Sequence, residues 1–126
     1  MPMHAVIETS AFLASAEYEG VTDDERAAIV AYIAEDPVRG DLIKDTGGAR
    51  KVRFAGKGKG KSGGYRIITY YAAEDVPVFL LDIYSKGTKA NLSQAQRNTL
   101  RKILSALAAE WRANVRAKVK PLRRPK

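Results

Sequence analysis

The sequence predicts an α+β domain in the order β-α-α-β-β-β-α, with a small antiparallel sheet and helices packed on it. Residues 50–54, 65–71 and 76–84 alternate polar with apolar side chains or form an apolar run, as strands do. Short links between these segments favour an antiparallel meander, with the helices on one side of it. Two Ser/Thr-x-x-Glu/Gln sequences mark helix starts. At 126 residues the chain is long enough for one domain with its own core.

The first part of the chain is expected to form one strand and two helices. Residues 4–9 are centred on two β-branched residues and predict a strand. Ser10 is the expected N-cap of a helix that Gly20 ends. A capping box over residues 22–25 predicts the start of a second helix, which ends near residues 36–37.

The last part of the chain predicts a buried strand and a long helix. Residues 76–84 are nearly all apolar, which is typical of a strand covered on both faces. Ser93 and Gln96 form a second capping box. The helix beyond carries an apolar stripe that we interpret as core packing: Leu100, Ile103, Leu104, Leu107 and Trp111. We therefore expect a single domain over residues 1–111, followed by a basic tail over residues 112–126 that is first the helix end and then disordered.

The charge is distributed unevenly along the chain. The formal net charge of +8 divides into −7 over residues 1–45 (ten acidic, three basic) and +15 over residues 46–126 (nineteen basic, four acidic). Such asymmetry indicates a half that faces nucleic acid.

Several classes of protein are disfavoured by composition. The chain has no cysteine and one histidine, His4, so metal sites and catalytic groups built on these residues are close to excluded, and no cofactor is expected. The sequence shows no signal peptide and no apolar run of about 20 residues, so we expect a soluble, cytoplasmic protein with no membrane partner.

The hairpin over residues 50–71 concentrates positive charge. No acidic residue occurs in it, and it carries seven cations: Arg50, Lys51, Arg53, Lys57, Lys59, Lys61 and Arg66. Mutual repulsion favours a polyanion bound between them. Residues 55–62 approach a nucleotide-binding P-loop, but two glycines and a strand-like run follow where that loop needs a helix.

The hairpin also carries a family resemblance. The run Gly47-Gly48-Ala49-Arg50-Lys51-Val52-Arg53 before the Lys/Gly loop, and Ser62-Gly63-Gly64-Tyr65-Arg66-Ile67-Ile68 after it, resemble the RelE superfamily of bacterial type II toxins. The similarity covers roughly residues 6–111 and is greatest to the HigB branch.

This resemblance implies an activity and partners. The chain would be a ribosome-dependent mRNA interferase, a metal-independent endoribonuclease that cuts mRNA in the ribosomal A site beside 16S rRNA and inhibits translation. A co-encoded antitoxin, a helix-turn-helix protein of the HigA kind, would hold it inactive.

The resemblance also implies site residues. Lys51 and Arg53 match basic positions before the loop, Arg66 matches an arginine on the next strand, and Lys86 and Lys89 match basic positions after the last strand. RelE has a tyrosine near its C-terminus where this chain has Ser93 or a neighbour, so Tyr84 and Tyr65 are the candidates to stack on a base.

The residues independently suit RNA cleavage. An RNA 2′-OH can attack the adjacent phosphate, so the protein needs to supply charge stabilisation and proton transfer but no nucleophile. Arg66 suits a phosphate clamp, Lys51 or Lys86 a proton-transfer role, and Lys57, Lys59 and Lys61 affinity for the RNA backbone. Two alternatives stay open: a ParE-like DNA gyrase poison and a nucleic-acid-binding module without catalysis.

Overall fold

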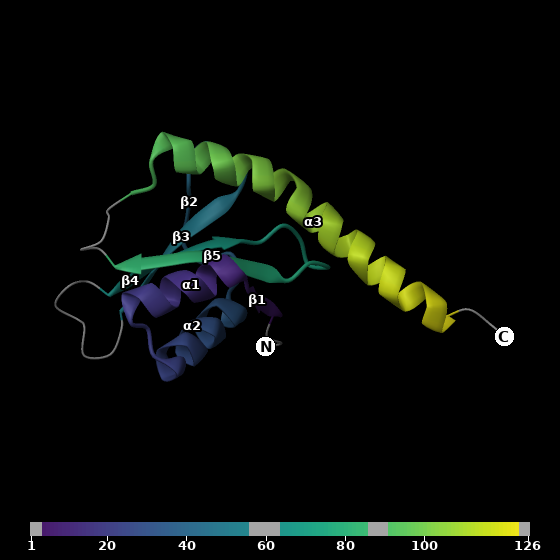
Figure 1. Ribbon diagram of the computed structural model, residues 1–126, viewed down its shortest axis with the longest axis horizontal. Helices are drawn as coiled ribbons and strands as arrows, with labels where there is room; N and C mark the ends of the chain where they lie inside the picture. The colour runs from purple at the N-terminus through teal and green to yellow at the C-terminus, as the bar shows by residue number, and fades with distance from the viewer. Residues whose placement is uncertain (1–3, 56–63, 86–90, 124–126) are drawn as a thin grey trace.

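The α+β fold class is confirmed by the computed structural model, which describes residues 4–55, 64–85 and 91–123, with side chains up to residue 115 (Figure 1). In chain order the elements are β1 (Val6–Glu8), α1 (Ser10–Glu19), α2 (Asp23–Glu35), β2 (Asp41–Leu42), β3 (Ala49–Phe54), β4 (Tyr65–Tyr70), β5 (Val78–Ser85) and α3 (Gln94–Arg123). Lys57, Lys59, Lys61, Lys86 and Lys89 lie outside the described residues.

The sheet is mixed, with the strand order β1-β5-β4-β3-β2. β3, β4 and β5 form the predicted antiparallel meander. β1 instead pairs parallel to β5, so the expectation of an antiparallel sheet is wrong at this edge. Parallel neighbours need a long connection, and the two helices and three strands between β1 and β5 supply it. β2 was not predicted because two exposed residues carry no alternation signal.

Helices cover both faces of the sheet, so the expectation that they lie on one side is wrong (Figure 1). On one face α1 and α2 pack against the sheet, with Phe12, Ile29 and Ile67 among the buried contacts. On the other face Leu104 of α3 packs with Ile68. Successive residues of a strand point to opposite faces, so a strand that is apolar throughout requires cover on both. The apolar run of β5 had indicated this requirement.

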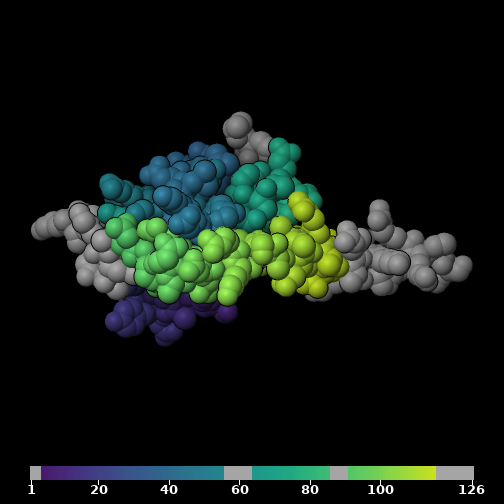
Figure 2. Space-filling model, turned by 90° about the horizontal axis from the view of Figure 1, so that it is seen from above, coloured from purple at the N-terminus to yellow at the C-terminus, as the bar shows by residue number. Residues whose placement is uncertain are grey.

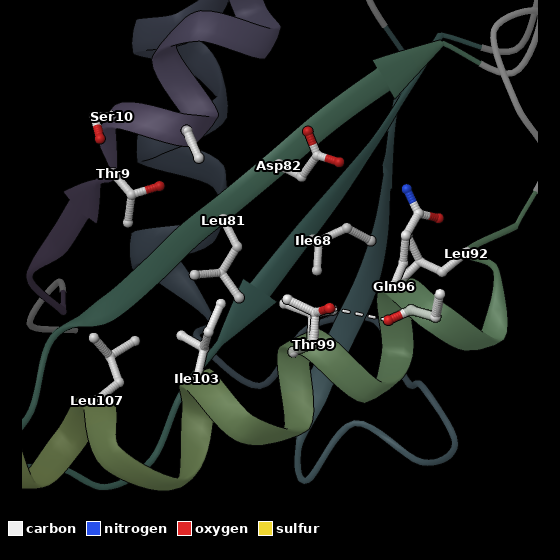
Figure 3. Close-up of a pocket in the computed structure, with 13 residues that line it drawn as sticks. Thr9, Ser10, Ile68, Leu81, Asp82, Leu92, Gln96, Thr99, Ile103 and Leu107 are labelled. Atoms are coloured by element: carbon white, nitrogen blue, oxygen red, sulfur yellow. Dashed lines mark hydrogen bonds between the residues drawn. The ribbon is translucent and has the colours of Figure 1, made fainter.

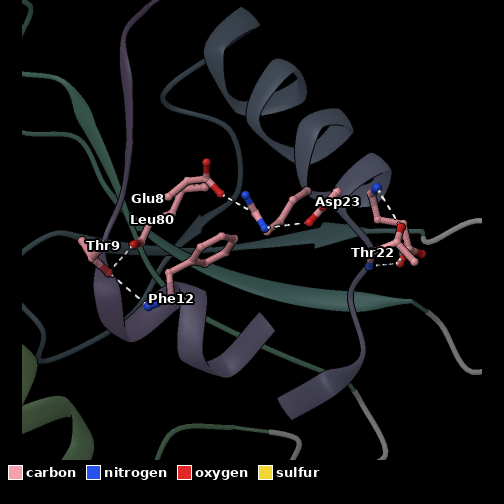
Figure 4. A network of polar contacts seen from close by, with 8 residues as sticks. Glu8, Thr9, Phe12, Thr22, Asp23 and Leu80 are labelled. Atoms are coloured by element: carbon pink, nitrogen blue, oxygen red, sulfur yellow. Dashed lines mark hydrogen bonds and ion pairs between the residues drawn. The ribbon is translucent and has the colours of Figure 1, made fainter. Parts of the chain in front are cut away.

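Polar caps fix where α1 and α2 begin (Figure 4). The N-cap of α1 is Thr9 rather than the expected Ser10. The Thr9 hydroxyl accepts from Phe12 N at 3.2 Å and donates to Leu80 O at 2.7 Å, which ties the start of α1 to β5. The predicted capping box of α2 is confirmed: Thr22 Oγ1 accepts from Glu25 N at 3.1 Å, and Glu25 Oε1 accepts from Thr22 N at 3.0 Å.

The start of α3 is the second predicted capping box, in which Gln96 N donates to Ser93 Oγ at 3.1 Å and Ser93 N donates to Gln96 Oε1 at 2.9 Å. Of the apolar stripe, Leu104 is buried and Trp111 packs edge-on against Phe79, with ring centroids 6.1 Å apart. Ile103 is 48% exposed, so its assignment to the core is wrong.

The end of α3 extends beyond the sheet (Figure 1) and the helix continues to Arg123. Seen from above, α3 lies across the molecule in green and yellow, and the N-terminal part of the chain, in purple, is visible along one side of it (Figure 2). The division into a domain of residues 1–111 and a tail of residues 112–126 stays a prediction.

Candidate active site

Three basic side chains from two strands share one face of the sheet. In the pairing register Arg53 lies opposite Arg66, and Arg66 lies opposite Tyr84, so the three form a row across β3, β4 and β5. Lys51 lies two residues from Arg53 and therefore points to the same face. We call Lys51, Arg53 and Arg66 the basic patch. The patch lies on the α3 face, where Tyr84 is part of the buried cluster.

Arg66 is the centre of the basic patch. Within residues 4–55, 64–85 and 91–115, it is the only buried charged side chain, with 7% of its surface exposed. Burying a guanidinium costs free energy, and an arginine directly opposite adds repulsion between like charges. Two positive charges directly opposite each other favour the binding of an anion beside them.

Tyr84 forms one side of the patch. Burial raises the pKa of Tyr84 above its ordinary value, and the positive charge of Arg66 offsets part of that rise. The phenol therefore stays protonated at neutral pH. Tyr84 contributes a neutral, polarisable wall beside Arg66.

Lys51 is positioned from outside the sheet. Its Nζ donates to Asn91 Oδ1 at 3.2 Å, and Asn91 lies just before α3. The segment that leads into α3 thus holds the ammonium of Lys51 at the edge of the patch. Asn91 was not predicted as a site residue, and a lone Asn in a polar loop carries no sequence signal for this contact.

Two predicted site residues do not join the basic patch. Arg50 points to the other face, as alternation requires, and donates to Val38 O at 3.1 Å and Gly40 O at 3.3 Å. Tyr65 is buried in the cluster beneath α1 and α2, with 3% of its surface exposed. Both residues therefore stabilise the fold on the far side of the sheet.

An apolar groove lies between α3 and β5 and reaches the start of α1 (Figure 3). Its volume is ≈ 580 Å³. Leu81, Ile103 and Leu107 supply much of its apolar wall, and Asp82 lies at the end nearer the basic patch (Figure 3). The exposed side chain of Ile103 belongs to this groove, which explains its place in the helical stripe.

Residues 4–122 match the family model described as "RelE toxin of RelE / RelB toxin-antitoxin system". This chain belongs to the RelE toxin family. Among solved structures it is similar to a double mutant of the E. coli toxin RelE in the free state, with 14% identity and a TM-score of 0.48. That match covers 69% of this chain and 87% of the other.

Membership of the RelE family makes the chain a toxin of a type II toxin–antitoxin system and implies an antitoxin partner. Assignment to the HigB branch stays a prediction. In the part of the chain that is described, no helix has the length and apolar character to cross a membrane. The same residues contain no group of three or more His, Cys, Asp or Glu side chains that could hold a metal ion.

Proposed function

We propose that this RelE-family toxin is a ribosome-dependent mRNA interferase that cuts the message in the ribosomal A site. The observation that carries the proposal is the row Arg53, Arg66 and Tyr84, with Lys51 beside it on the same face. An exposed arginine, a buried arginine and a lysine converge where a phosphate could lie. RNA supplies the nucleophile that this set of residues lacks.

The proposed reaction is an attack of a ribose 2′-oxygen on the adjacent phosphorus. A new O–P bond forms to give a 2′,3′-cyclic phosphate, and the bond to the 5′-oxygen of the next nucleotide breaks. A base takes the 2′-OH proton and an acid protonates the leaving 5′-oxygen. Lys51 and Lys86 are the candidates for proton transfer.

Arg66 is the proposed phosphate clamp. Its planar guanidinium can donate two hydrogen bonds to two phosphate oxygens and stays charged throughout the reaction. Its burial restricts the directions in which it can point, so little reorganisation is needed as charge develops. Arg53, exposed and opposite, adds a second positive charge on the solvent side.

The deciding experiment maps new 5′ ends of a defined mRNA in a reconstituted translation reaction, with a ribosome-free control. New ends that need ribosomes are the expected result. Intact message with inhibited DNA supercoiling would favour a gyrase poison, and intact message without either effect would favour a binding module. Arg66→Gln should lower the cleavage rate by about 10²- to 10³-fold, the cost of removing one charge-stabilising donor.

Two further variants make that result specific to Arg66. Arg66→Lys keeps the charge and loses the fork, so it should recover only part of the rate. Arg50→Gln is the matched control, since Arg50 lies on the same sheet and faces away from the patch. Equal losses of cleavage rate in Arg50→Gln and Arg66→Gln would contradict the assignment of Arg66 as the phosphate clamp.

The lysines at positions 57, 59 and 61 are proposed to serve affinity. Their replacement by glutamine should weaken binding to the programmed ribosome and flatten its salt dependence, with turnover at saturation little changed. An equal fall in binding and turnover would contradict this division.

The proposed partner is a co-encoded antitoxin of the HigA kind, with an apolar segment of that antitoxin lying in the groove beside α3. Contiguous apolar surface open to water indicates a protein contact. Between residues 94 and 115, α3 carries Arg97, Arg101, Lys102 and Arg112 against one acid, Glu110, so charge complementarity favours a segment with acidic residues at its flanks.

The groove can be tested with two matched substitutions on α3. Ile103→Glu places a charge in the groove and should weaken antitoxin binding by at least about 10-fold, measured by calorimetry. Ser105→Glu adds the same charge on an exposed position outside the groove lining and should change the affinity by less than about 2-fold. Unchanged affinity of Ile103→Glu would place the antitoxin elsewhere.

A further inference from the structure

Arg97 lies on the side of α3 that packs on the sheet. Leu104 and Trp111 contact the sheet from this side, and Arg97 precedes Leu104 by the same interval that separates Leu104 from Trp111. That interval is almost two turns of an α-helix, so the three side chains lie on one side of α3. Arg97 is accordingly half-buried, whereas Arg101 and Lys102 are exposed.

The contacts on either side of Arg97 place it beside the basic patch. Before it in the chain, Asn91 Oδ1 accepts from Lys51 Nζ at 3.2 Å, and after it Leu104 shares a buried cluster with Ile68. Lys51 and Ile68 are opposite each other in the sheet, so Arg97 lies over this pair. Long side chains on a helix point back toward its start, which directs the guanidinium of Arg97 toward Lys51.

The guanidinium of Arg97 lacks an acceptor. Within the part of the chain that the structure describes, its Nε is buried without a hydrogen-bond partner, and no ion pair includes this side chain. Arg101, one turn further on, instead donates to Asp45 O at 3.3 Å. A buried N–H without an acceptor costs free energy, and the positive end of the helix dipole adds to the cost near the start of α3. An anion bound beside Arg97 would offset both.

We propose that Arg97 is a further RNA-binding residue, which donates hydrogen bonds to the phosphate next to the scissile one. This inference rests on the proposed cleavage of RNA and extends its site onto α3. The Arg53–Arg66 pair lies two residues from the pair beneath Arg97, which is about 7 Å along the strands. Successive phosphates of an RNA strand are a similar distance apart, so a scissile phosphate at Arg66 would bring a neighbouring phosphate to Arg97.

The neighbouring phosphate does not react, so its contact with Arg97 should contribute equally before and during the reaction. Arg97→Gln should therefore raise the KM for programmed ribosomes by about 10- to 150-fold, the range for one lost hydrogen bond to a charged group. Turnover at saturation should change by less than about 2-fold. The slope of log affinity against log salt should fall by about 0.7, the value for one phosphate contact on a single strand.

Two variants separate this contact from the general effect of charge. Lys102→Gln removes the same charge from an exposed position on α3 and should change the KM by less than about 2-fold. Arg97→Lys keeps the charge and loses the planar fork, so it should restore the salt dependence and only part of the affinity.

A modified message tests the contact itself. Once the cut site is mapped, the cut nucleotide is given a 2′-O-methyl group, which blocks cleavage, and each flanking phosphate in turn is replaced by an uncharged methylphosphonate. One of these replacements should weaken binding of wild type to programmed ribosomes by at least about 10-fold. The same replacement should weaken binding of Arg97→Gln by less than about 2-fold, because its contact is already lost.

Additive losses from Arg97→Gln and the methylphosphonate would overturn the inference, as would a fall in turnover with unchanged KM in Arg97→Gln. If Arg97→Gln does not fold, wild type decides alone: equal binding of the natural and both modified messages would overturn the inference. Cleavage mapping judges the proposed function separately. A wild type that binds these ribosomes and cuts no message would refute that function, while coupling between Arg97 and a flanking phosphate would still support the RNA contact.

Discussion

Arg53→Gln should stabilise the protein and impair its function. Arg53 lies directly opposite Arg66 on neighbouring antiparallel strands, and both carry fixed positive charge. Removing the exposed charge relieves repulsion without exposing apolar surface, because glutamine keeps the polar tip and part of the stem. The same change takes one cation away from the proposed phosphate site.

The size of the effect follows from the register. Cross-strand charged pairs are worth about 0.2–1 kcal/mol, and like charges directly opposite destabilise by similar amounts. With an unfolding entropy of about 2.1 cal/mol/K per residue, the 126 residues give a rise in Tm of about 1–4 °C. Salt screens the repulsion, with a Debye length of about 3 Å at 1 M, so the gain should shrink as salt is added.

The measurement is thermal unfolding of wild type and Arg53→Gln at low salt and at about 1 M NaCl, together with the cleavage assay. Arg50→Gln is the control: it lies on the same strand but loses hydrogen bonds to two backbone carbonyls, so it should lower Tm. A lower Tm for Arg53→Gln than for wild type, or a rise in Tm that does not change with salt, would refute the argument that Arg53 and Arg66 repel each other and are both kept because they bind phosphate.

Other predictions concern stability. Burial raises the pKa of Tyr84 and of Tyr65, where the carboxylates of Glu25 and Glu19 add to the effect, so the folded state holds these phenolic protons more tightly. The stability that the protonated phenols contribute is fully present below the ordinary pKa of 10.0 and is lost as pH rises through the folded pKa. Between about pH 8 and about pH 11, the free energy of unfolding of Tyr84→Phe, measured by urea denaturation, should therefore fall less than that of wild type. Equal falls in the two proteins would contradict this. Leu104→Ala, at a site 1% exposed, should cost about 2–5 kcal/mol by urea denaturation, and a cost below about 1 kcal/mol would mean that α3 is not anchored there. Thr22→Ala removes a capping box and should cost about 1 kcal/mol in the same assay, with Thr22→Ser near wild type.

Local signals in the sequence predicted local structure well. Both capping boxes involve side chains and backbone groups three residues apart, so their geometry follows from the residues alone. The N-cap of α1 was displaced by one residue, since Thr9 also donates to Leu80, a partner 71 residues away that the sequence does not show. Long-range contacts of this kind decide between neighbouring capping residues.

Residue type alone was sufficient to predict the basic residues of the candidate site, but it could not show which face of the sheet each side chain lies on. Arg53 and Arg66 were identified from charge and motif, and strand pairing brings them together. Arg50 and Tyr65 were predicted from residue type as well, but each is one position away from a residue of the site face (Lys51 and Arg66) and falls on the opposite face, because strands alternate.

A β-bulge determines which residues of β5 reach the site. The register shifts between Ile68 and Thr69, where β4 passes from pairing with Asp82 to pairing with Leu80, so Leu81 is an extra residue on β5. In the half of β5 before the bulge Phe79 faces α3, as its contact with Trp111 shows. Continuous alternation from Phe79 would send positions 81, 83 and 85 to that face and would turn Tyr84 away.

The extra residue shifts the alternation of side chains along β5 by one position. After the bulge the even-numbered residues face the α3 side, so Tyr84 stands beside Arg66 while Ile83 enters the core beneath α1 and α2. Bulges occur beside active sites because one added residue re-aims the side chains that follow. Here the bulge lets β5 serve two purposes: its first half supports the groove beside α3, and its second half completes the site.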